Sequence, residues 1–282
     1  MTTYIFPGQG SQIKGMGNSL FTEFAELTEK ADNILGYSIS KLCLEDSNGE
    51  LNKTNFTQPA LYTVSALSYL KKLAETGKPP EYVAGHSLGE YNALFAAGVF
   101  DFETGLKLVQ KRGALMSMAT GGGMAAVIGL KHDDVRLVLE RNNLNNLKIA
   151  NYNSLTQFVI SGPKEVINSA EDAFVKAGAM LYLPLNVSGA FHSPYMENAQ
   201  NEFAAFIKNF KFNDPKITVI ANVDAKPYQA HAIESNLVQQ ITHSVMWTQS
   251  VDYLLNQGET IFEEVGPGKV LTGLVSRIQK GL

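Results

Sequence analysis

Short apolar runs alternate along the first part of the chain with longer segments in which apolar residues recur every three or four positions. The runs at residues 4–6 and 82–84 each lead into a glycine-rich turn, which predicts buried strands. The periodic segments predict helices at residues 21–31, 59–73 (with Pro59 near the helix start), 90–97 and 102–118. Strands that alternate with helices are typical of a parallel sheet covered on both faces, so the pattern predicts an α/β fold.

The pattern changes after Gly121-Gly122-Gly123, which is either a hinge or a surface turn. Beyond it the expected order is strand, helix, strand, strand, helix, strand, over residues 124–130, 133–142, 147–153, 157–161, 163–177 and 180–185. This βαββαβ order is that of ferredoxin-like folds. We therefore expect residues 123–187 to form a small ferredoxin-like domain, inserted into a large domain made of residues 1–122 and 188–282.

The last third of the chain returns to the pattern of the large domain. Helical spacing covers residues 193–206, 233–241, 251–257 and 270–278, and apolar runs predict strands at residues 216–222 and 260–265.

Composition narrows the class of protein. Of the 282 residues, 45% are hydrophobic and 18% charged, which excludes intrinsic disorder as the main state. A net charge of −4 argues against a nucleic-acid partner, and no apolar run is long enough to cross a bilayer. The start of the chain lacks the features of a signal peptide. A single cysteine, Cys43, and the lack of metal-ligand spacing favour a cytoplasmic protein without disulfide or metal.

The segment Gly85-His86-Ser87-Leu88-Gly89 lies between a predicted strand and a predicted helix. This is the context of a G-x-S-x-G nucleophile elbow, in which flanking glycines allow a sharp turn that presents the serine hydroxyl. The N–H of Leu88, at the start of the following helix, would stabilise an oxyanion. An ordinary glycine-rich turn can carry the same sequence. The position between a predicted strand and a predicted helix favours the catalytic interpretation.

A serine nucleophile at neutral pH needs a base. His192 stands in a glycine-containing loop after a predicted strand, and it follows Ser87 in the order typical of hydrolase-like folds. A surface histidine at the start of a helix is an equally good interpretation from the residues alone. No acidic residue stands out as a third member, and a backbone carbonyl can also orient the imidazole. The other histidines are His86, which is expected to point away from the serine, His132, His231 and His243.

Seven motifs in order make the chain resemble the malonyl-CoA:acyl carrier protein transacylases, in particular the free-standing acyltransferases of modular polyketide synthases. They are FPGQGSQ at residues 6–12, TQPA at 57–60, GHSLGE at 85–90, QKRG at 110–113, NYNS at 151–154, GAFH at 189–192 and EVGPGK at 264–269. The resemblance runs from end to end. It implies a large hydrolase-like domain with a nucleophile elbow.

The resemblance implies a role for each matching residue. Ser87 matches the acylated serine and His192 its base, and Gln9 would form the oxyanion hole together with the Leu88 amide. Arg112 matches the arginine that binds the malonyl carboxylate, and a planar guanidinium suits two hydrogen bonds to such a group. Taken alone, an arginine beside a lysine on a helix is more often a solvated charge.

Four further residues take implied roles. Gln240 matches a glutamine whose main-chain carbonyl orients the histidine, and His86 and Asn153 are expected to bind substrate. Phe191 stands where relatives that select methylmalonyl carry a smaller residue, so it would exclude a methyl group on the acyl chain. Excluding one methyl contributes about 1–3 kcal/mol, so selectivity is expected to be strong but not absolute.

The implied reaction is a ping-pong transfer of malonyl from malonyl-CoA, the donor substrate, to the phosphopantetheine thiol of an acyl carrier protein. It needs no bound cofactor and no metal, and polyketide biosynthesis is the expected pathway. Three alternatives stay open at this point: the same reaction in fatty-acid synthesis, hydrolysis of carrier-bound thioesters, and a non-catalytic module that only binds the carrier.

Overall fold

A parallel sheet forms the centre of the larger part of the molecule, as the sequence predicts. The computed structural model describes residues 2–282; Met1, the first residue of the expected large domain, lies outside the described residues. The strand order is β7-β2-β1-β8, and all three pairings are parallel. The strands are β1 (Thr2–Phe6), β2 (Tyr82–Gly85), β7 (Thr218–Ile220) and β8 (Ile261–Glu264).

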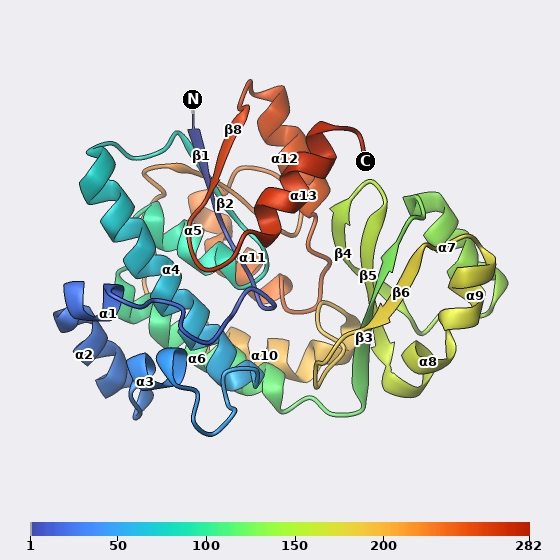
Figure 1. Ribbon diagram of the computed structural model, residues 1–282, viewed down its shortest axis with the longest axis horizontal. Helices are drawn as coiled ribbons and strands as arrows, with labels where there is room; N and C mark the ends of the chain where they lie inside the picture. Colours follow the sequence, from blue (N-terminus) through green and yellow to red (C-terminus); the bar gives the residue numbers. More distant parts are fainter. Residues whose placement is uncertain (1) are drawn as a thin grey trace.

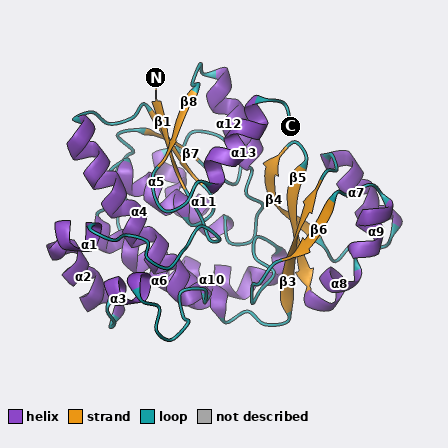
Figure 2. Ribbon diagram, viewed as in Figure 1, coloured by secondary structure: helices purple, strands orange, loops and turns teal. Residues whose placement is uncertain are grey.

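Helices cover both faces of this sheet (Figure 2). Successive residues of a strand point to opposite faces. Tyr4 and Phe6 therefore belong to one buried cluster, with α4, α5 and α6, whereas Ile5 belongs to another, with α12 and α13. The helices of this part of the molecule are α1 (Leu20–Glu23), α2 (Ala25–Leu35), α3 (Ile39–Leu44), α4 (Thr54–Thr76), α5 (Gly89–Ala96), α6 (Phe102–Ser117), α10 (Glu197–Ile207), α11 (Ile233–Gln239), α12 (Trp247–Asn256) and α13 (Val270–Gln279). Short 3-10 turns occupy Pro194–Met196 and Ala230–Ala232.

A second, antiparallel sheet stands beside the first, in green to yellow in Figure 1. Its order is β4-β5-β3-β6, from β3 (Gly122–Ile128), β4 (Lys148–Ser154), β5 (Gln157–Pro163) and β6 (Leu181–Pro184). The helices α7 (His132–Arg141), α8 (Lys164–Ser169) and α9 (Glu171–Lys176) cover its outer face and share a separate buried cluster with it. The inner face contributes Met124 and Val159 to the main cluster. The second sheet therefore has its own core and also packs against the larger part.

The main chain of β4 joins the two parts. Val245 donates from its N–H to the Ala150 carbonyl at 2.8 Å, and its own carbonyl accepts from the Tyr152 N–H at 3.0 Å. These bonds fix the inner face of the second sheet relative to the loop before α12.

Some predicted elements are wrong in detail. Helix α4 begins at Thr54, so Pro59 lies inside it rather than at its start. The missing N–H of Pro59 removes only a bond to the first turn of this long helix. The helix expected at residues 163–177 is two helices, because Gly162-Pro163 complete strand β5 and α8 ends at Ser169. The Ser169 hydroxyl donates to the Val166 carbonyl at 3.2 Å, a local bond that competes with helix continuation.

No helix within residues 2–282 combines the length and the apolar character that crossing a membrane requires.

The three consecutive glycines have different surroundings. Gly121 has a φ of 74° and open space around it, as a turn residue does. Gly122 and Gly123 are instead paired in β3, opposite Pro163 and Gly162. A Cβ atom on Gly122 would lie 2.2 Å from the main-chain nitrogen of Ala190, in the loop that leads to His192. The glycine at position 122 is therefore required by close packing of two backbones.

We expect Gly122→Ala to lower the free energy of unfolding by about 1–3 kcal/mol, because one of the two backbones must move. Gly123→Ala is the matched control, since its Cβ would meet Lys164 no closer than 3.3 Å. Urea unfolding of both variants measures the difference. Equal losses would show that the approach to Ala190 is not the constraint.

Candidate active site

Three strands of the parallel sheet end at one edge. Phe6 at the end of β1 is in register with Gly85 of β2, and Ala84 of β2 with Ile220 of β7. The carboxyl edge of a parallel sheet is where α/β proteins bind ligands. The loops that leave this edge carry Gln9, Ser87 and Asn222.

Ser87 occupies a tight turn between β2 and α5, with a φ of 51°. Non-glycine residues seldom adopt this left-handed conformation. Glycines on both sides make the turn possible. A Cβ atom on Gly85 would lie 2.0 Å from the main chain of Gly89, and one on Gly89 would lie 2.0 Å from the Phe6 carbonyl oxygen. The turn therefore packs directly against the end of β1.

Asn222, just after β7, holds this turn from the other side. Its Oδ1 accepts from the Ser87 N–H at 2.7 Å, and its Nδ2 donates to the Gly85 carbonyl at 2.7 Å. One buried side chain thus satisfies two backbone groups of the strained turn.

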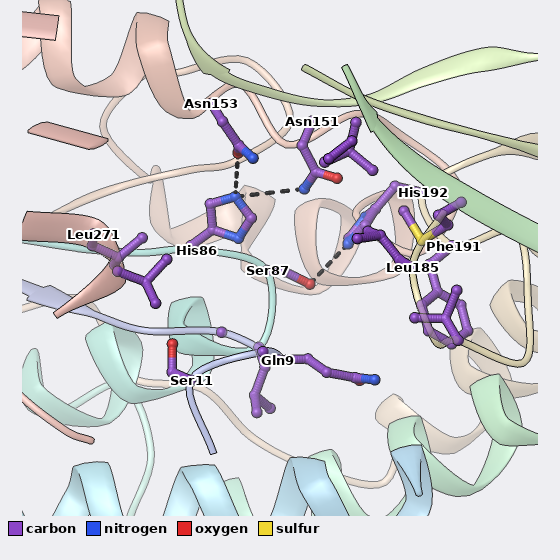
Figure 3. A pocket seen from close by; sticks show the side chains of 18 of the residues that line it. Gln9, Ser11, His86, Ser87, Asn151, Asn153, Leu185, Phe191, His192 and Leu271 are labelled. Carbon is purple, nitrogen blue, oxygen red and sulfur yellow. Dashed lines mark hydrogen bonds between the residues drawn. The ribbon is translucent and has the colours of Figure 1, made fainter. Parts of the chain in front are cut away.

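The imidazole of His192 meets the Ser87 hydroxyl. The distance from Ser87 Oγ to His192 Nε2 is 2.8 Å, and Figure 3 shows the hydroxyl pointing at the ring. On the other side of the ring, Nδ1 lies 2.8 Å from the Gln240 carbonyl oxygen and 3.2 Å from that of His243. Carbonyl oxygens only accept, so Nδ1 carries the proton and Nε2 offers its lone pair to Ser87.

His192 is held neutral by its surroundings. Burial lowers the pKa of the imidazole to about 3, and the positive charge of Arg112 adds to this effect, whereas the two carbonyl acceptors oppose it. At neutral pH the ring is therefore uncharged, and the lone pair of Nε2 is free to accept a proton.

Arg112 projects from α6 into the same site and is 1% exposed. Its Nη2 donates to Ser87 Oγ at 3.1 Å and to Gln240 Oε1 at 2.8 Å, and its Nη1 donates to Gln58 Oε1 at 2.8 Å. The central carbon of its guanidinium, Cζ, lies 5.6 Å from the centre of the Tyr91 ring. Within residues 2–282 no carboxylate forms an ion pair with this guanidinium. A buried cation whose direct hydrogen-bond partners are all neutral suits an incoming anion.

Two main-chain amides are free near the serine. Within the described part of the chain, the N–H groups of Gln9 and Leu88 donate to no protein acceptor. The side chain of Gln9 is directed away, because its Nε2 donates to Thr54 Oγ1 at 3.2 Å. Any contribution of Gln9 to an oxyanion hole therefore falls to its main chain.

A cavity of about 280 Å³ opens at Ser87 between the two sheets. His86 lies on its wall, where Nε2 is 2.9 Å from Asn153 Oδ1 and 3.5 Å from Asn151 Nδ2 (Figure 3). Burial lowers the pKa of His86. Phe191, which is 5% exposed, lines the cavity together with apolar residues of the second sheet. Eight of the nine residues expected from the sequence line this cavity, and the ninth, Gln240, lies behind it, bonded to Arg112 and His192.

The family model described as "Acyl transferase domain" matches residues 3–280 of this chain. The chain belongs to the acyl transferase domain family.

Curated relatives and solved structures of similar length agree with the family. The acyl transferase is 58% identical over 281 residues to the polyketide biosynthesis malonyl CoA-acyl carrier protein transacylase PksC of Bacillus subtilis, with 99% of this chain and 98% of the relative covered. A malonyl CoA-acyl carrier protein transacylase structure from Burkholderia pseudomallei matches with a TM-score of 0.97 at 50% identity, covering 100% and 99% of the two chains. The structure of a malonyl-transacylase in complex with its type II polyketide synthase acyl carrier protein matches with a TM-score of 0.93 at 40% identity. The match covers 100% of this chain and 94% of the other.

Three polar residues at the site of this acyl transferase were not expected from the sequence: Asn222, Gln58 and Glu90. Asn222 had a usable signal, since it is the last residue of the strand predicted at residues 216–222. Gln58 and Glu90 lie within the motifs at residues 57–60 and 85–90, but a polar residue on a helix gives no sign that it is buried. Both are 1% exposed.

The acyl transferase is expected to lose stability in acid partly through His192. In the unfolded chain this histidine binds a proton below its ordinary pKa of about 6.5, whereas in the folded protein it stays neutral down to about 3. Between these values the unfolded state holds more protons, so the free energy of unfolding falls as pH falls.

We expect wild type to lose about 2 kcal/mol more than His192→Gln between pH 7 and pH 5, as measured by urea unfolding. Other groups titrate alike in both proteins and cancel in the difference. Parallel curves would contradict a buried neutral imidazole.

Proposed function

We propose that the chain transfers a malonyl group from malonyl-CoA to the phosphopantetheine thiol of an acyl carrier protein, through an ester on Ser87. One observation carries this proposal. Ser87 Oγ lies within hydrogen-bond distance of both a neutral imidazole and a buried guanidinium, at 2.8 and 3.1 Å. A nucleophile, a base and a carboxylate-binding cation thus converge on one atom. The names of the relatives give the donor and the acceptor.

In the first half-reaction, His192 Nε2 takes the proton of Ser87 as Oγ attacks the thioester carbonyl of malonyl-CoA. The Gln240 and His243 carbonyls stabilise the imidazolium that forms. The free amides of Gln9 and Leu88 donate to the developing oxyanion. The imidazolium then protonates the leaving CoA thiolate, and a malonyl ester stays on Ser87.

Arg112 holds the free carboxylate of that ester. Its Nη2 atom is already beside Ser87 Oγ. Only one CH₂ group separates the carboxylate from the ester carbonyl, so the carboxylate lies within reach of the guanidinium. The planar guanidinium can give it two hydrogen bonds. Gln58 and Gln240 keep the guanidinium in place when Ser87 and the carboxylate exchange as acceptors.

In the second half-reaction the carrier's thiol enters the cavity and takes the place of CoA. His192 accepts its proton as sulfur attacks the ester carbonyl, and the same amides stabilise the second oxyanion. The bond from the acyl carbon to Ser87 Oγ then breaks, His192 returns the proton to that oxygen, and the malonyl group leaves on the carrier's thiol. The apolar walls contributed by the second sheet keep water away from the ester, so that transfer exceeds hydrolysis.

The proposal extends to the architecture. We assign the turn at Ser87 as a nucleophile elbow, because it joins a strand to a helix with the serine at positive φ. We assign residues 123–187 as an inserted ferredoxin-like domain and residues 1–122 and 188–282 as the large domain. The order β4-β5-β3-β6, with helices on one face and a separate core, supports the insertion.

Two further assignments concern substrate choice. We assign Phe191 as the residue that restricts branching at the second carbon of the acyl group, because it is packed into the cavity wall next to His192. We assign His86 and Asn153 to the opposite wall, where their hydrogen-bonded pair faces the acyl thioester. Polyketide biosynthesis is the pathway that the relative from Bacillus subtilis favours. A cytoplasmic location stays a prediction.

Replacing Ser87 with alanine is expected to abolish the malonyl adduct that forms when the protein is mixed with malonyl-CoA. Intact-protein mass spectrometry reads the added mass of one malonyl group directly. His192→Ala is the companion variant, which keeps the hydroxyl but loses the base and should form the adduct slowly. A full adduct on Ser87→Ala would refute the proposed ester.

Replacing Arg112 with alanine is expected to lower kcat/KM for malonyl loading by at least about 100-fold, because a charged pair in a buried site is lost. Acetyl loading, which offers no carboxylate, should fall far less or rise, because the charge of Arg112 lowers the pKa of His192. Arg112→Lys keeps the charge but not the planar pair of donors, so its kcat/KM for malonyl loading should lie between those of wild type and Arg112→Ala. Equal losses for malonyl and acetyl would contradict the carboxylate role.

A further inference from the structure

The side-chain amide of Gln240 lies at the meeting point of three charged or polar groups. Its Oε1 accepts from Arg112 Nη2 at 2.8 Å. Its Nε2 donates to the Ser87 carbonyl oxygen at 2.8 Å and to Glu90 Oε2. Gln240 is fully buried, so no solvent can replace a lost partner.

Only one orientation of this amide satisfies all its neighbours. A half-turn of the group would set its NH₂ against the guanidinium of Arg112, where both partners are donors. The same turn would set its oxygen against the Ser87 carbonyl and the Glu90 carboxylate, where all are acceptors. The groups on the two sides therefore determine that the oxygen faces Arg112.

Glu90 supplies the acceptor with the greatest negative charge in that set. Burial raises the pKa of Glu90 to about 7, whereas the donors Asn222, Tyr228 and Gln240 favour the ionised form, so above this pH the side chain only accepts. It projects from the first turn of α5 and is 1% exposed. Its Oε1 accepts from the Asn222 N–H at 2.8 Å and from the Tyr228 hydroxyl at 2.9 Å, which leaves Oε2 to Gln240. The carboxylate thus touches no reacting atom, yet it borders two residues that hold the serine turn and the guanidinium.

We infer that Glu90 is a positioning residue for recognition of the acyl carboxylate: its acceptor-only side chain orients the Gln240 amide so that the amide oxygen holds Arg112. The inference rests on the proposed function and adds to it. Two acceptors hold the guanidinium of Arg112, namely Gln58 on α4 and Gln240. When both bonds are made, the guanidinium is held in place for the incoming anion.

Glu90→Gln tests this inference with little change in shape. The new side chain keeps an oxygen for the Asn222 N–H, and so brings an NH₂ group against the NH₂ of Gln240. Two donors cannot share that contact, and Gln240 relieves it only by turning its own NH₂ toward Arg112 or by moving away. In either case Arg112 loses an acceptor.

We expect Glu90→Gln to lower kcat/KM for malonyl loading by about 10- to 100-fold, the usual effect of losing one charge-assisted hydrogen bond. Acetyl loading of the same variant should change much less, because Ser87 and His192 keep their contact. Most of the malonyl effect should lie in KM. The acetyl reaction also shows that the variant is folded. Glu90→Asp, which again only accepts, should retain more of the malonyl preference than Glu90→Gln.

Tyr228→Phe is the matched control. It removes a donor from the same buried carboxylate, but from Oε1, so the Gln240 amide keeps its orientation. We expect it to lower the thermal midpoint while the ratio of malonyl to acetyl loading stays that of wild type. An equal fall of both reactions in Glu90→Gln, or a changed ratio in Tyr228→Phe, would overturn the inference. Failure of the wild type to load malonyl would instead refute the proposed function.

Discussion

A buried positive charge that no carboxylate of the protein touches directly is the constraint on which this site depends. Arg112 is surrounded by the oxygens of Gln58, Gln240 and Ser87, all neutral. Removing a guanidinium from water costs several kcal/mol unless other groups compensate. The fold compensates with dipoles in direct contact, and the carboxylate of Glu90 reaches Arg112 only through Gln240, which leaves the guanidinium donors available to a ligand. A carboxylate partner in the protein would stabilise the empty site and compete with the substrate.

The position of that charge follows from the packing of the large part of the molecule. Helix α6 packs along α4, which brings Arg112 beside Gln58, and the loop after α11 brings Gln240 to the other side. The strained turn at Ser87 is held by Asn222 and by the end of β1. Segments that are far apart in sequence thus meet at one hydroxyl, and none of them could hold the geometry alone.

The sequence predicts the parallel sheet, the order of elements along the second sheet and the turn at Ser87, because apolar runs mark strands and glycines mark the turn. Arg112 and Gln240 leave no such local signal, and they are expected only because of the resemblance to a known family. The sequence does not predict that Gly122 is needed for the approach to Ala190, because the pairing of two distant backbones leaves no local trace. Glu90 illustrates the same limit, since an acidic residue in the first turn of a helix is ordinarily explained by the helix dipole. Its burial and its three donors depend on β7 and on the loop after α11.

Without substrate, the charge of Arg112 makes His192 a weaker base, and the carboxylate of the proposed substrate removes this effect. The charge of Arg112 lowers the pKa of His192, and its bond to Ser87 Oγ weakens the nucleophile. A carboxylate bound to Arg112 neutralises the charge and takes over the guanidinium donors. In the proposed reaction the base therefore becomes stronger and the hydroxyl freer when the bound acyl group carries a carboxylate. An acetyl group leaves both effects in place, so discrimination arises in the acylation step as well as in binding.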